Sequence, residues 1–276
     1  MATLRVPGSE LHYEAVGDGI PVVLAHGHAL DLRMWDDQVT ALADVATVVR
    51  YDARGFGRSP RDPETPYSHA DDLWRLADHL GIDSAVLVGL SMGGRTVVEA
   101  TLAAPERVRA LVLLDALLEG VPWDPESKRD MDAIGEGLRD GGLDAAKAAF
   151  LRHGFFVPAR RNLDIARRLT EMIGDYSGIA WTSPDPHLPH PPSIELLGTI
   201  TAPTTIVVGE LDVPCFREMS EFLAAGIPCA RLVTVPDAGH MVNMEAPGTV
   251  NALLREVVLK VASVGYIDPI WGRDDG

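Results

Sequence analysis

Basic side chains are scarce in this sequence. It has 24 lysine and arginine residues against 40 aspartate and glutamate residues, so its formal net charge is −16 at pH 7. Nucleic acids and anionic membrane surfaces are themselves negative, and a chain with this balance repels them and offers no basic patch for binding. We therefore expect neither a nucleic-acid partner nor a membrane partner.

Long apolar runs are also missing. No stretch approaches the roughly 20 consecutive apolar residues that a membrane-spanning helix needs. The start of the chain, MATLRVPGSELHYEAVGDG, lacks the long apolar segment of a secretory signal peptide. The sequence therefore predicts a cytoplasmic location.

Cysteine is rare, with only Cys215 and Cys229 present. A helix expected at about 215–225 would hold them near its two ends, roughly 16 Å apart at about 1.5 Å of rise per residue, which is too far for a disulfide. Cytoplasmic proteins also keep their thiols reduced. We expect two free, unreactive thiols.

Residues suited to a buried core are abundant. Hydrophobic residues fill 46% of the 276 positions, enough for one large domain or a domain with an insertion. Six segments rich in valine, leucine and isoleucine are typical of strands buried on both faces: 20–25, 45–51, 84–89, 109–114, 203–209 and 229–235. Helical patterns occur at about 33–43, 69–80, 93–104, 215–225 and 247–262. Their alternation predicts an α/β fold, a mostly parallel sheet covered by helices.

The alternation stops between residues 117 and 196, where no strand pattern is found. Helical patterns occur there at about 124–139, 143–152 and 159–173. We interpret 117–196 as an inserted helical cap and residues 1–116 with 197–276 as the core domain.

The end of this insertion carries five prolines between residues 184 and 192. Such a segment cannot be helical and is expected to be an extended connection. Because no third ligand matches the spacing of His187 and His190, we interpret both as residues of a solvated linker rather than as a metal site.

The segment VLVGLSMGGRT at 86–96 contains a G-x-S-x-G motif at the point where a predicted strand meets a predicted helix. A serine on so sharp a turn has a strained backbone and projects its hydroxyl away from the sheet. The flanking glycines are needed because the helix leaves close to the strand. Ser91 is therefore the candidate nucleophile.

A serine hydroxyl needs a histidine base and an acid that orients the histidine. Asp212 follows the buried strand 203–209, and His240 lies on the loop between the last strand and the last helix. The order Ser91, Asp212, His240 is that of such hydrolases. In a parallel sheet all three positions fall at the carboxyl edge, where ligands bind.

Two other acids compete with Asp212. Asp115 ends the strand 109–114 and so also lies at the carboxyl edge, and Glu210 is two residues before Asp212. We favour Asp212 because the loop after its strand is long enough to reach the loop of His240. Asp237 fits a turn residue before Ala238 and Gly239.

Hydrolysis through a serine also needs backbone N–H groups that stabilise the negative oxygen of the intermediate. One candidate is the amide of Met92, directly after the nucleophile. The other comes from His26-Gly27-His28, after the strand 20–25, where Gly27 permits an unusual turn and the amide of His28 is our choice. The ring of His28 would then lie near the substrate entrance, and His26 is interpreted as a structural residue bonded to neighbouring loops.

Taken together, these motifs resemble the α/β-hydrolase superfamily over essentially the whole core. The matching segments are HGH at 26–28, YDARGFGRSP at 51–60, GLSMGG at 89–94, GELD at 209–212 and GHMVNMEAP at 239–247. Three longer stretches, LDLRMWDDQVTAL, VVRYDARGFGRS and LGIDSAVLVGLSMGG, are similar to the 3-oxoadipate enol-lactonase group and related cofactor-free serine esterases.

The resemblance implies catalytic roles for Ser91, Asp212 and His240, oxyanion roles for His28 and Met92, and no cofactor or metal. Two features depart from it. His28 stands where many members have an apolar or small residue, and the predicted cap contains no motif that we recognise.

We therefore expect a serine hydrolase that cleaves a small carboxylic ester or lactone through an acyl-enzyme. The cap supplies candidate pocket residues: Trp123, Phe150, Phe155, Phe156 and Trp181. Carbon–carbon bond hydrolysis, cofactor-free perhydrolase or haloperoxidase chemistry, and a slow-turnover ligand receptor remain open. A dehalogenase is disfavoured because serine replaces the aspartate that such enzymes use. The sequence also leaves open a homo-oligomer.

Substrate charge is a separate question. An enol-lactonase substrate would carry a carboxylate, and an arginine facing Ser91 would be needed to bind it against the negative charge of the protein. The candidates are Arg33, Arg152, Arg160 and Arg161, but nothing in their spacing requires any of them to face Ser91. We expect an apolar pocket and a neutral substrate.

Overall fold

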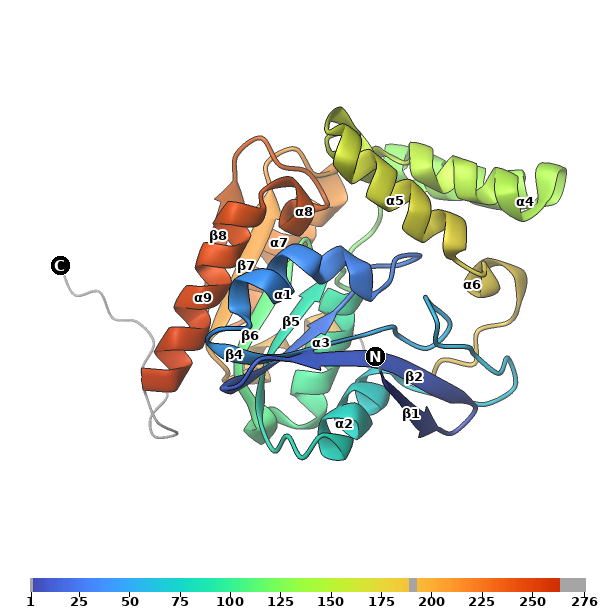
Figure 1. Cartoon of the computed structure of the whole chain (residues 1–276). Helices are drawn as coiled ribbons and strands as arrows, with labels where there is room; N and C mark the ends of the chain where they lie inside the picture. The colour runs from blue at the N-terminus through green and yellow to red at the C-terminus, as the bar shows by residue number, and fades with distance from the viewer. Residues whose placement is uncertain (1, 189–192, 264–276) are drawn as a thin grey trace.

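An eight-stranded sheet forms the centre of the protein in the computed structural model, which describes residues 2–188 and 193–263 (Figure 1). The strands are β1 (Ala2–Val6), β2 (Ser9–Val16), β3 (Ile20–Ala25), β4 (Ala46–Tyr51), β5 (Ala85–Leu90), β6 (Val108–Leu114), β7 (Thr204–Gly209) and β8 (Ala230–Val235). Their order is β1-β2-β4-β3-β5-β6-β7-β8. β2 is antiparallel to both of its neighbours, and the remaining pairs are parallel. The predicted α/β class and mostly parallel sheet are confirmed.

The sequence patterns missed β1 and β2. These strands lie at one edge of the sheet. Each mixes exposed and buried residues, so neither contains a continuous apolar run. β5, in contrast, is buried along its whole length. An apolar run therefore identifies the central strands and gives no signal for an exposed edge hairpin.

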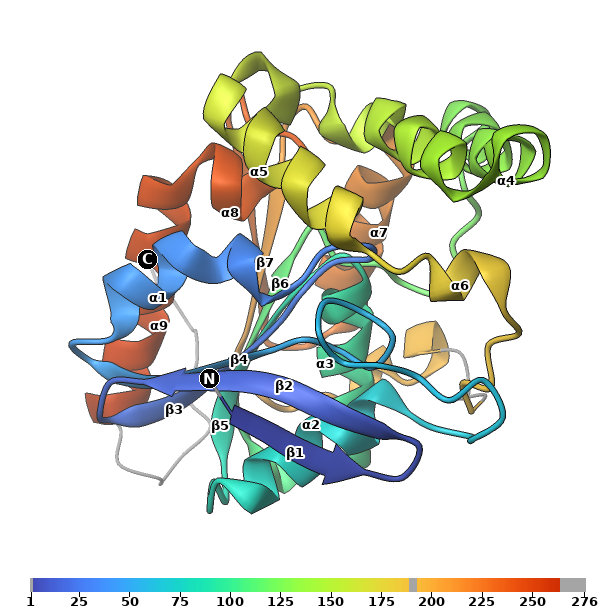
Figure 2. The same cartoon turned by 45° about the vertical axis from the view of Figure 1, so that its right-hand side comes forward.

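Helices cover both faces of the sheet (Figure 2). α1 (Asp36–Leu42) packs beside α9 (Pro247–Ser263) on one face. On the other face, α2 (His69–His79) packs beside α3 (Met92–Ala103), and α7 (Pro214–Gly226) packs on β7 and β8. Both faces of the central strands are thereby removed from water, which explains their uninterrupted apolar sequences.

The chain reverses its direction across the sheet at β3. From β3 it passes to β4 on one side and then to β5 on the other. Parallel pairing places Ala25 of β3 opposite Gly89 of β5. The loop after β3 and the turn after β5 are therefore neighbours, and such a reversal point is where open α/β sheets bind ligands.

Three helices lie over the carboxyl edge of the sheet: α4 (Pro125–Arg152), α5 (Leu163–Asp175) and α6 (Ile179–Thr182). Gly142, at φ 72°, breaks α4 into two pieces that correspond to the predicted helices. α5 begins at residue 163 and not at 159 as expected. The side chain of Asn162 caps its first turn by accepting from the amides of Asp164 and Ile165, and residues 159–161 form a separate 3-10 turn.

The expectation of a solvated linker is wrong for His187. His187 forms an isolated parallel β-bridge with Tyr67, and the amide of Leu188 donates to the carbonyl of Tyr67 at 2.7 Å. The pairing with Tyr67 satisfies the carbonyl of Pro186 and the amide of Leu188. The half-buried ring of His187 lies against Tyr67 and His69. His190 lies outside the described residues.

Both cysteines are free, as expected. Cys215 is buried at the start of α7, and burial raises the pKa of its thiol to about 11. Cys229 follows the end of the same helix and is partly exposed. None of the described helices is both long enough and apolar enough to cross a membrane.

Candidate active site

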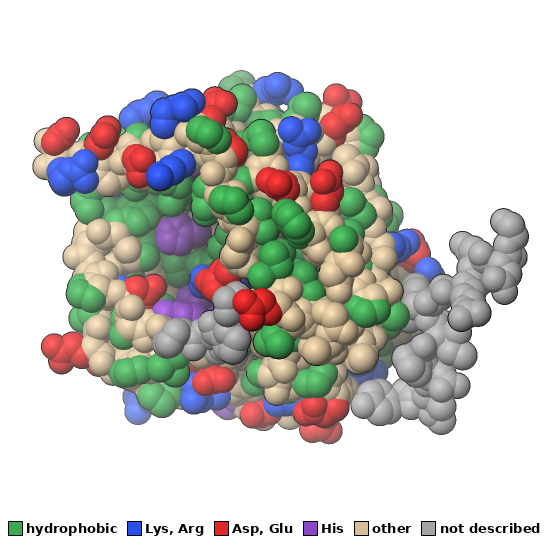
Figure 3. Space-filling view, turned by 180° about the vertical axis from the view of Figure 1, so that it is seen from behind, with side chains coloured by type: hydrophobic (Ala, Val, Ile, Leu, Met, Phe, Trp, Pro, Cys, Tyr) green, Lys and Arg blue, Asp and Glu red, His purple; other side chains and the backbone are tan. Residues whose placement is uncertain are grey.

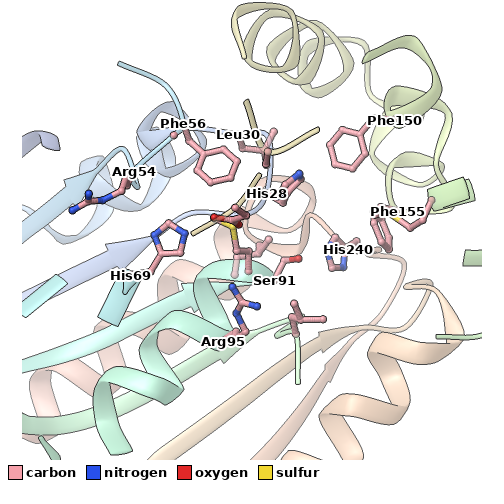
Figure 4. Close-up of a pocket in the computed structure, with 18 of the residues that line it drawn as sticks. His28, Leu30, Arg54, Phe56, His69, Ser91, Arg95, Phe150, Phe155 and His240 are labelled. Carbon is pink, nitrogen blue, oxygen red and sulfur yellow. The ribbon is translucent and has the colours of Figure 1, made fainter. Parts of the chain in front are cut away.

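Ser91 is held on a strained turn between β5 and α3 (Figure 4). Its φ is 54° and its ψ is −117°, values that a residue with a side chain rarely adopts. The turn is tight because α3 leaves against the end of β3. A Cβ on Gly93 would collide with the carbonyl of Ala25, and a Cβ on Gly89 would collide with the carbonyl of Gly93. The glycines of the motif are therefore a packing requirement.

His240 and Asp212 form a buried pair at the same edge of the sheet. The Nδ1–H of His240 donates to Oδ2 of Asp212 at 2.9 Å. The other carboxylate oxygen of Asp212 accepts from the amide of Val213 at 2.7 Å. Glu245 holds the loop by accepting from the amides of Gly239 and Met241, each at 3.0 Å. The unused Nε2 of His240 is left to exchange a proton.

Aromatic rings surround His240. Phe155 stacks on it with ring centres 4.6 Å apart, and Phe216 meets it edge-on at 4.3 Å. This packing fixes the ring plane and keeps water away from the His240–Asp212 bond, which strengthens its electrostatic interaction.

Ser91 and His240 line one cavity of about 300 Å³. From behind, Figure 3 shows a hollow with histidine and apolar side chains in its walls. Four of the five aromatic residues that we expected line the cavity: Trp123, Phe150, Phe155 and Phe156. Trp181 does not. It packs behind the wall against Phe150, and its indole N–H donates to the ring of His28.

The competing acid Asp115 is fully buried at the end of β6. Its Oδ1 accepts from the amide of Gly209 at 2.8 Å, and its Oδ2 has no hydrogen-bond partner among the described residues. Burial, followed by the nearby charge of Asp212, raises the pKa of Asp115 well above its ordinary value. The raised pKa favours the protonated form of Asp115, whereas Asp212 is the acid that bonds to His240.

Glu210, the second competitor, is exposed and accepts from the amide of Asp237 at 3.3 Å. Its carboxylate therefore bonds to the turn at Asp237 and not to His240. Asp237 has a φ of 59°, in agreement with the predicted turn.

Asp115, Asp212 and His240 also form the single described group of three whose ligand atoms, all within 4.8 Å of one another, fit a metal ion. A metal would need ionised carboxylates and free ring nitrogens. Here Nδ1 of His240 is bonded to Asp212, and the raised pKa of Asp115 favours its protonated form, so neither group is ready to bind a metal.

The loop after β3 lies directly against Ser91. A Cβ on Gly27 would sit 3.7 Å from the Cβ of Ser91. His26 is structural, as predicted: its Nδ1–H donates to the carbonyl of Gly27 at 2.8 Å, and its Nε2 accepts from the amide of Ala53 at 2.9 Å. The amide of His28 therefore follows a fixed turn beside the serine, and the amide of Met92 opens α3 on its other side.

The arginines at the cavity differ from the four candidates that the sequence offered. Arg33, Arg152, Arg160 and Arg161 do not line it, whereas Arg54, Arg61 and Arg95 do. Arg33 lies outside the cavity, where it pairs with Asp31 and Asp175. Arg160 donates to the carbonyl of Leu151. The cap arginines therefore stabilise the surface rather than the site.

Each of the three cavity arginines has an acidic partner: Asp72 for Arg54, Asp185 for Arg61, and Glu119 for Arg95. The cavity wall is thus close to neutral. The position of Arg95 at the cavity could have been predicted from the sequence, because a residue four positions after Ser91 in a helix lies on the same helix face. Arg54 and Arg61 lie on a loop, where sequence spacing does not determine direction.

The comparison with known proteins agrees with the fold. A family model described as alpha/beta hydrolase fold matches residues 20–247. The chain therefore belongs to the alpha/beta hydrolase family.

Three relatives illustrate its neighbourhood. A protein of Caulobacter sp. (strain K31), provisionally named carbamate hydrolase RutD, is 31% identical over 88% of this chain and 92% of its own length. A thermophilic esterase from Thermogutta terrifontis, solved with malate bound, is 33% identical over 94% of this chain and 97% of that one, with a TM-score of 0.79. The enol-lactonase of Burkholderia xenovorans LB400 is 25% identical over 94% and 100%, with a TM-score of 0.76.

Proposed function

We propose that this alpha/beta hydrolase is a serine hydrolase that cleaves a small, neutral carboxylic ester or lactone through an acyl-enzyme. One observation carries the proposal. Ser91, on its strained turn, shares a cavity of about 300 Å³ with His240, whose Nδ1 lies 2.9 Å from Oδ2 of Asp212.

The chemistry assigned to these groups is acyl transfer. Oγ of Ser91 attacks the carbonyl carbon while Nε2 of His240 takes the hydroxyl proton, and Asp212 stabilises the imidazolium that forms. The amides of His28 and Met92 are assigned to the negative oxygen of the tetrahedral intermediate. Its collapse breaks the bond to the leaving oxygen, which takes the proton from His240. Water, activated by the same histidine, then releases the acid and restores Ser91.

The walls support a small and neutral substrate. Most of the residues that line the cavity are apolar or aromatic, and its three arginines are paired with acids. The names of the relatives, an esterase, an enol-lactonase and a carbamate hydrolase, all describe attack on a carboxyl-derived carbonyl. Carbamates therefore belong beside esters and lactones in the first substrate panel.

Labelling of the nucleophile tests the proposal. A serine-directed phosphonate or sulfonyl fluoride should modify the wild-type protein once, and Ser91→Ala should remove both the label and acyl transfer. The fold should survive, because the serine side chain contributes little packing. Undiminished labelling of the alanine variant would show that another residue is the nucleophile.

The same assays separate the alternatives. A carbon–carbon bond hydrolase would cleave diketones faster than esters, and a perhydrolase would need hydrogen peroxide for its main product. A receptor would become labelled yet turn over its best ester very slowly. Turnover numbers across the panel decide among them.

Metal independence is a separate expectation. Dialysis against a chelator should leave ester hydrolysis unchanged, because Asp115, Asp212 and His240 are assigned to proton chemistry. Loss of activity that zinc restores would instead assign these three residues to a metal.

A further inference from the structure

The ring of His28 occupies the cavity beside the candidate nucleophile. Figure 4 shows it between the rings of Phe56 and Phe150, close to Ser91. Its centre is 5.2 Å from Phe56, 5.9 Å from Phe150 and 6.0 Å from Tyr176, and all three contacts are edge-on. This imidazole is therefore a polar group in an otherwise aromatic wall.

A hydrogen bond from Trp181 determines where the imidazole carries its proton. Nε1 of Trp181 lies 3.2 Å from Nε2 of His28. An indole N–H can only donate, so Nε2 must be the acceptor and the ring proton must be on Nδ1. Burial, with help from the charges of His26 and Arg95 and against that of Asp185, lowers the pKa of His28 to about 4. At neutral pH the ring is uncharged and carries this one proton.

The Nδ1–H of His28 has no acceptor in the described part of the chain. Nδ1 takes part in none of the hydrogen bonds of residues 2–188 and 193–263, although the residue lines the cavity. Nδ1 is not among the buried side-chain atoms that lack a partner, so this N–H is accessible at the cavity that His28 lines. The donor is therefore suited to an acceptor that arrives with a ligand.

We propose that Nδ1–H of His28 donates a hydrogen bond to a second oxygen of the substrate, one near the scissile carbonyl. The preferred substrates are then esters or lactones with an ether, hydroxyl or oxo oxygen in the acyl part or ring. This inference rests on the proposed hydrolase function. Trp181, which does not line the cavity, acts as a positioning residue because it fixes the tautomer of His28.

The position of the second oxygen follows from the covalent structure of His28. The backbone amide of His28 is assigned to the oxyanion, and its ring is joined to the same Cα through Cβ. The ring donor therefore lies only a few atoms from the reacting carbonyl.

Two matched esters test the inference: nitrophenyl butanoate and nitrophenyl methoxyacetate. They have the same leaving group and chain length, and differ by one CH₂ replaced by an ether oxygen. Their intrinsic reactivities differ, so the measured quantity is the ratio of kcat/KM values in each variant divided by that ratio in the wild type. His28→Phe keeps the backbone amide and an aromatic ring but removes the donor, and it should lower the preference for methoxyacetate by about tenfold.

Trp181→Phe should lower the same preference by less, because it frees the His28 tautomer without removing the ring. Nitrogen NMR of His28 should show protonated Nδ1 in the wild type and a mixture of tautomers in Trp181→Phe. Trp123→Phe is the matched control, since Trp123 also lines the cavity but its ring contacts are with Phe155 and Phe216. It should leave the substrate ratio unchanged.

An unchanged ratio in His28→Phe would overturn the inference, as would an equal fall in Trp123→Phe. If both esters lose activity in proportion, the ring acts on the carbonyl that they share and not on a second oxygen. These failures differ from failure of the proposed function, in which the wild type would hydrolyse neither ester and Ser91 would not be labelled.

Discussion

At the scale of single residues, two neighbouring aspartates have different surroundings. Asp212 bonds to His240, whereas Asp115 is buried beside it and has a pKa well above its ordinary value. We expect Asp212→Asn to lower kcat strongly, by up to ~10⁴, because an amide can hold the histidine in the wrong tautomer. Asp115→Asn should do far less, because an asparagine can still accept from Gly209 and has the shape and neutrality of the protonated acid.

Asp115→Leu supplies the control for that comparison. It leaves the buried amide of Gly209 without its acceptor and should cost about 1–3 kcal/mol of unfolding free energy, measured in urea. If Asp115→Asn proved more damaging to kcat than Asp212→Asn, the orienting acid would belong to β6.

The sequence predicted which residues would lie at this site. It did not predict where their protons would be. Chain order and the carboxyl edge were enough to select Ser91, Asp212 and His240. The protonation of Asp115 depends on how deeply the end of β6 is buried and on the nearness of Asp212, and neither can be read from spacing. The tautomer of His28 likewise depends on Trp181, which is 153 positions away in the chain.

At the scale of elements, α4 is connected to His240, the proposed base, through a stack of rings. His153 follows α4 and stacks on Phe155 with centres 3.5 Å apart, and Phe155 stacks on His240. Burial lowers the pKa of His153 to about 4, although Asp130, 3.8 Å away, opposes the shift. The junction between α4 and the core is therefore built around an uncharged histidine.

This lowered pKa predicts a loss of stability in acid. Between pH ~6.5 and ~4 the unfolded chain binds a proton at this histidine that the folded chain does not, so the unfolding free energy falls as the pH falls through that window. His153→Gln should weaken this dependence by up to one proton. Urea unfolding at several pH values measures it, and the difference at neutral pH gives the packing loss alone. An unchanged slope would mean that His153 is protonated in the folded protein.

The helices and strands that could be predicted were those with a recognisable pattern within their own sequence. β3, β5, β6 and β7 have continuous apolar sequences, and the G-x-S-x-G motif identified the turn after β5. The four-residue helix α8 (Val242–Glu245) is too short for a periodic pattern. The bridge between His187 and Tyr67 joins segments 120 positions apart and had no signal in either one.

At the scale of the whole molecule, the charge of −16 and the paired arginines act together on substrate choice. The net charge repels anions at long range. Within the cavity, Glu119 neutralises Arg95, the arginine nearest to Ser91 in the sequence. No surplus positive charge is left there to offset the repulsion.

We therefore expect neutral esters or lactones to be hydrolysed with a higher kcat/KM than matched substrates that carry a carboxylate. The preference should shrink with added salt, because the Debye length falls from about 10 Å at 0.1 M to about 3 Å at 1 M ionic strength. Measuring both substrate series at low and high salt tests this, with Arg95→Met as the variant that removes one of the three cavity arginines. A clear preference for the carboxylate series, abolished in Arg95→Met, would reject the neutral substrate and show that Arg95 exchanges Glu119 for the substrate.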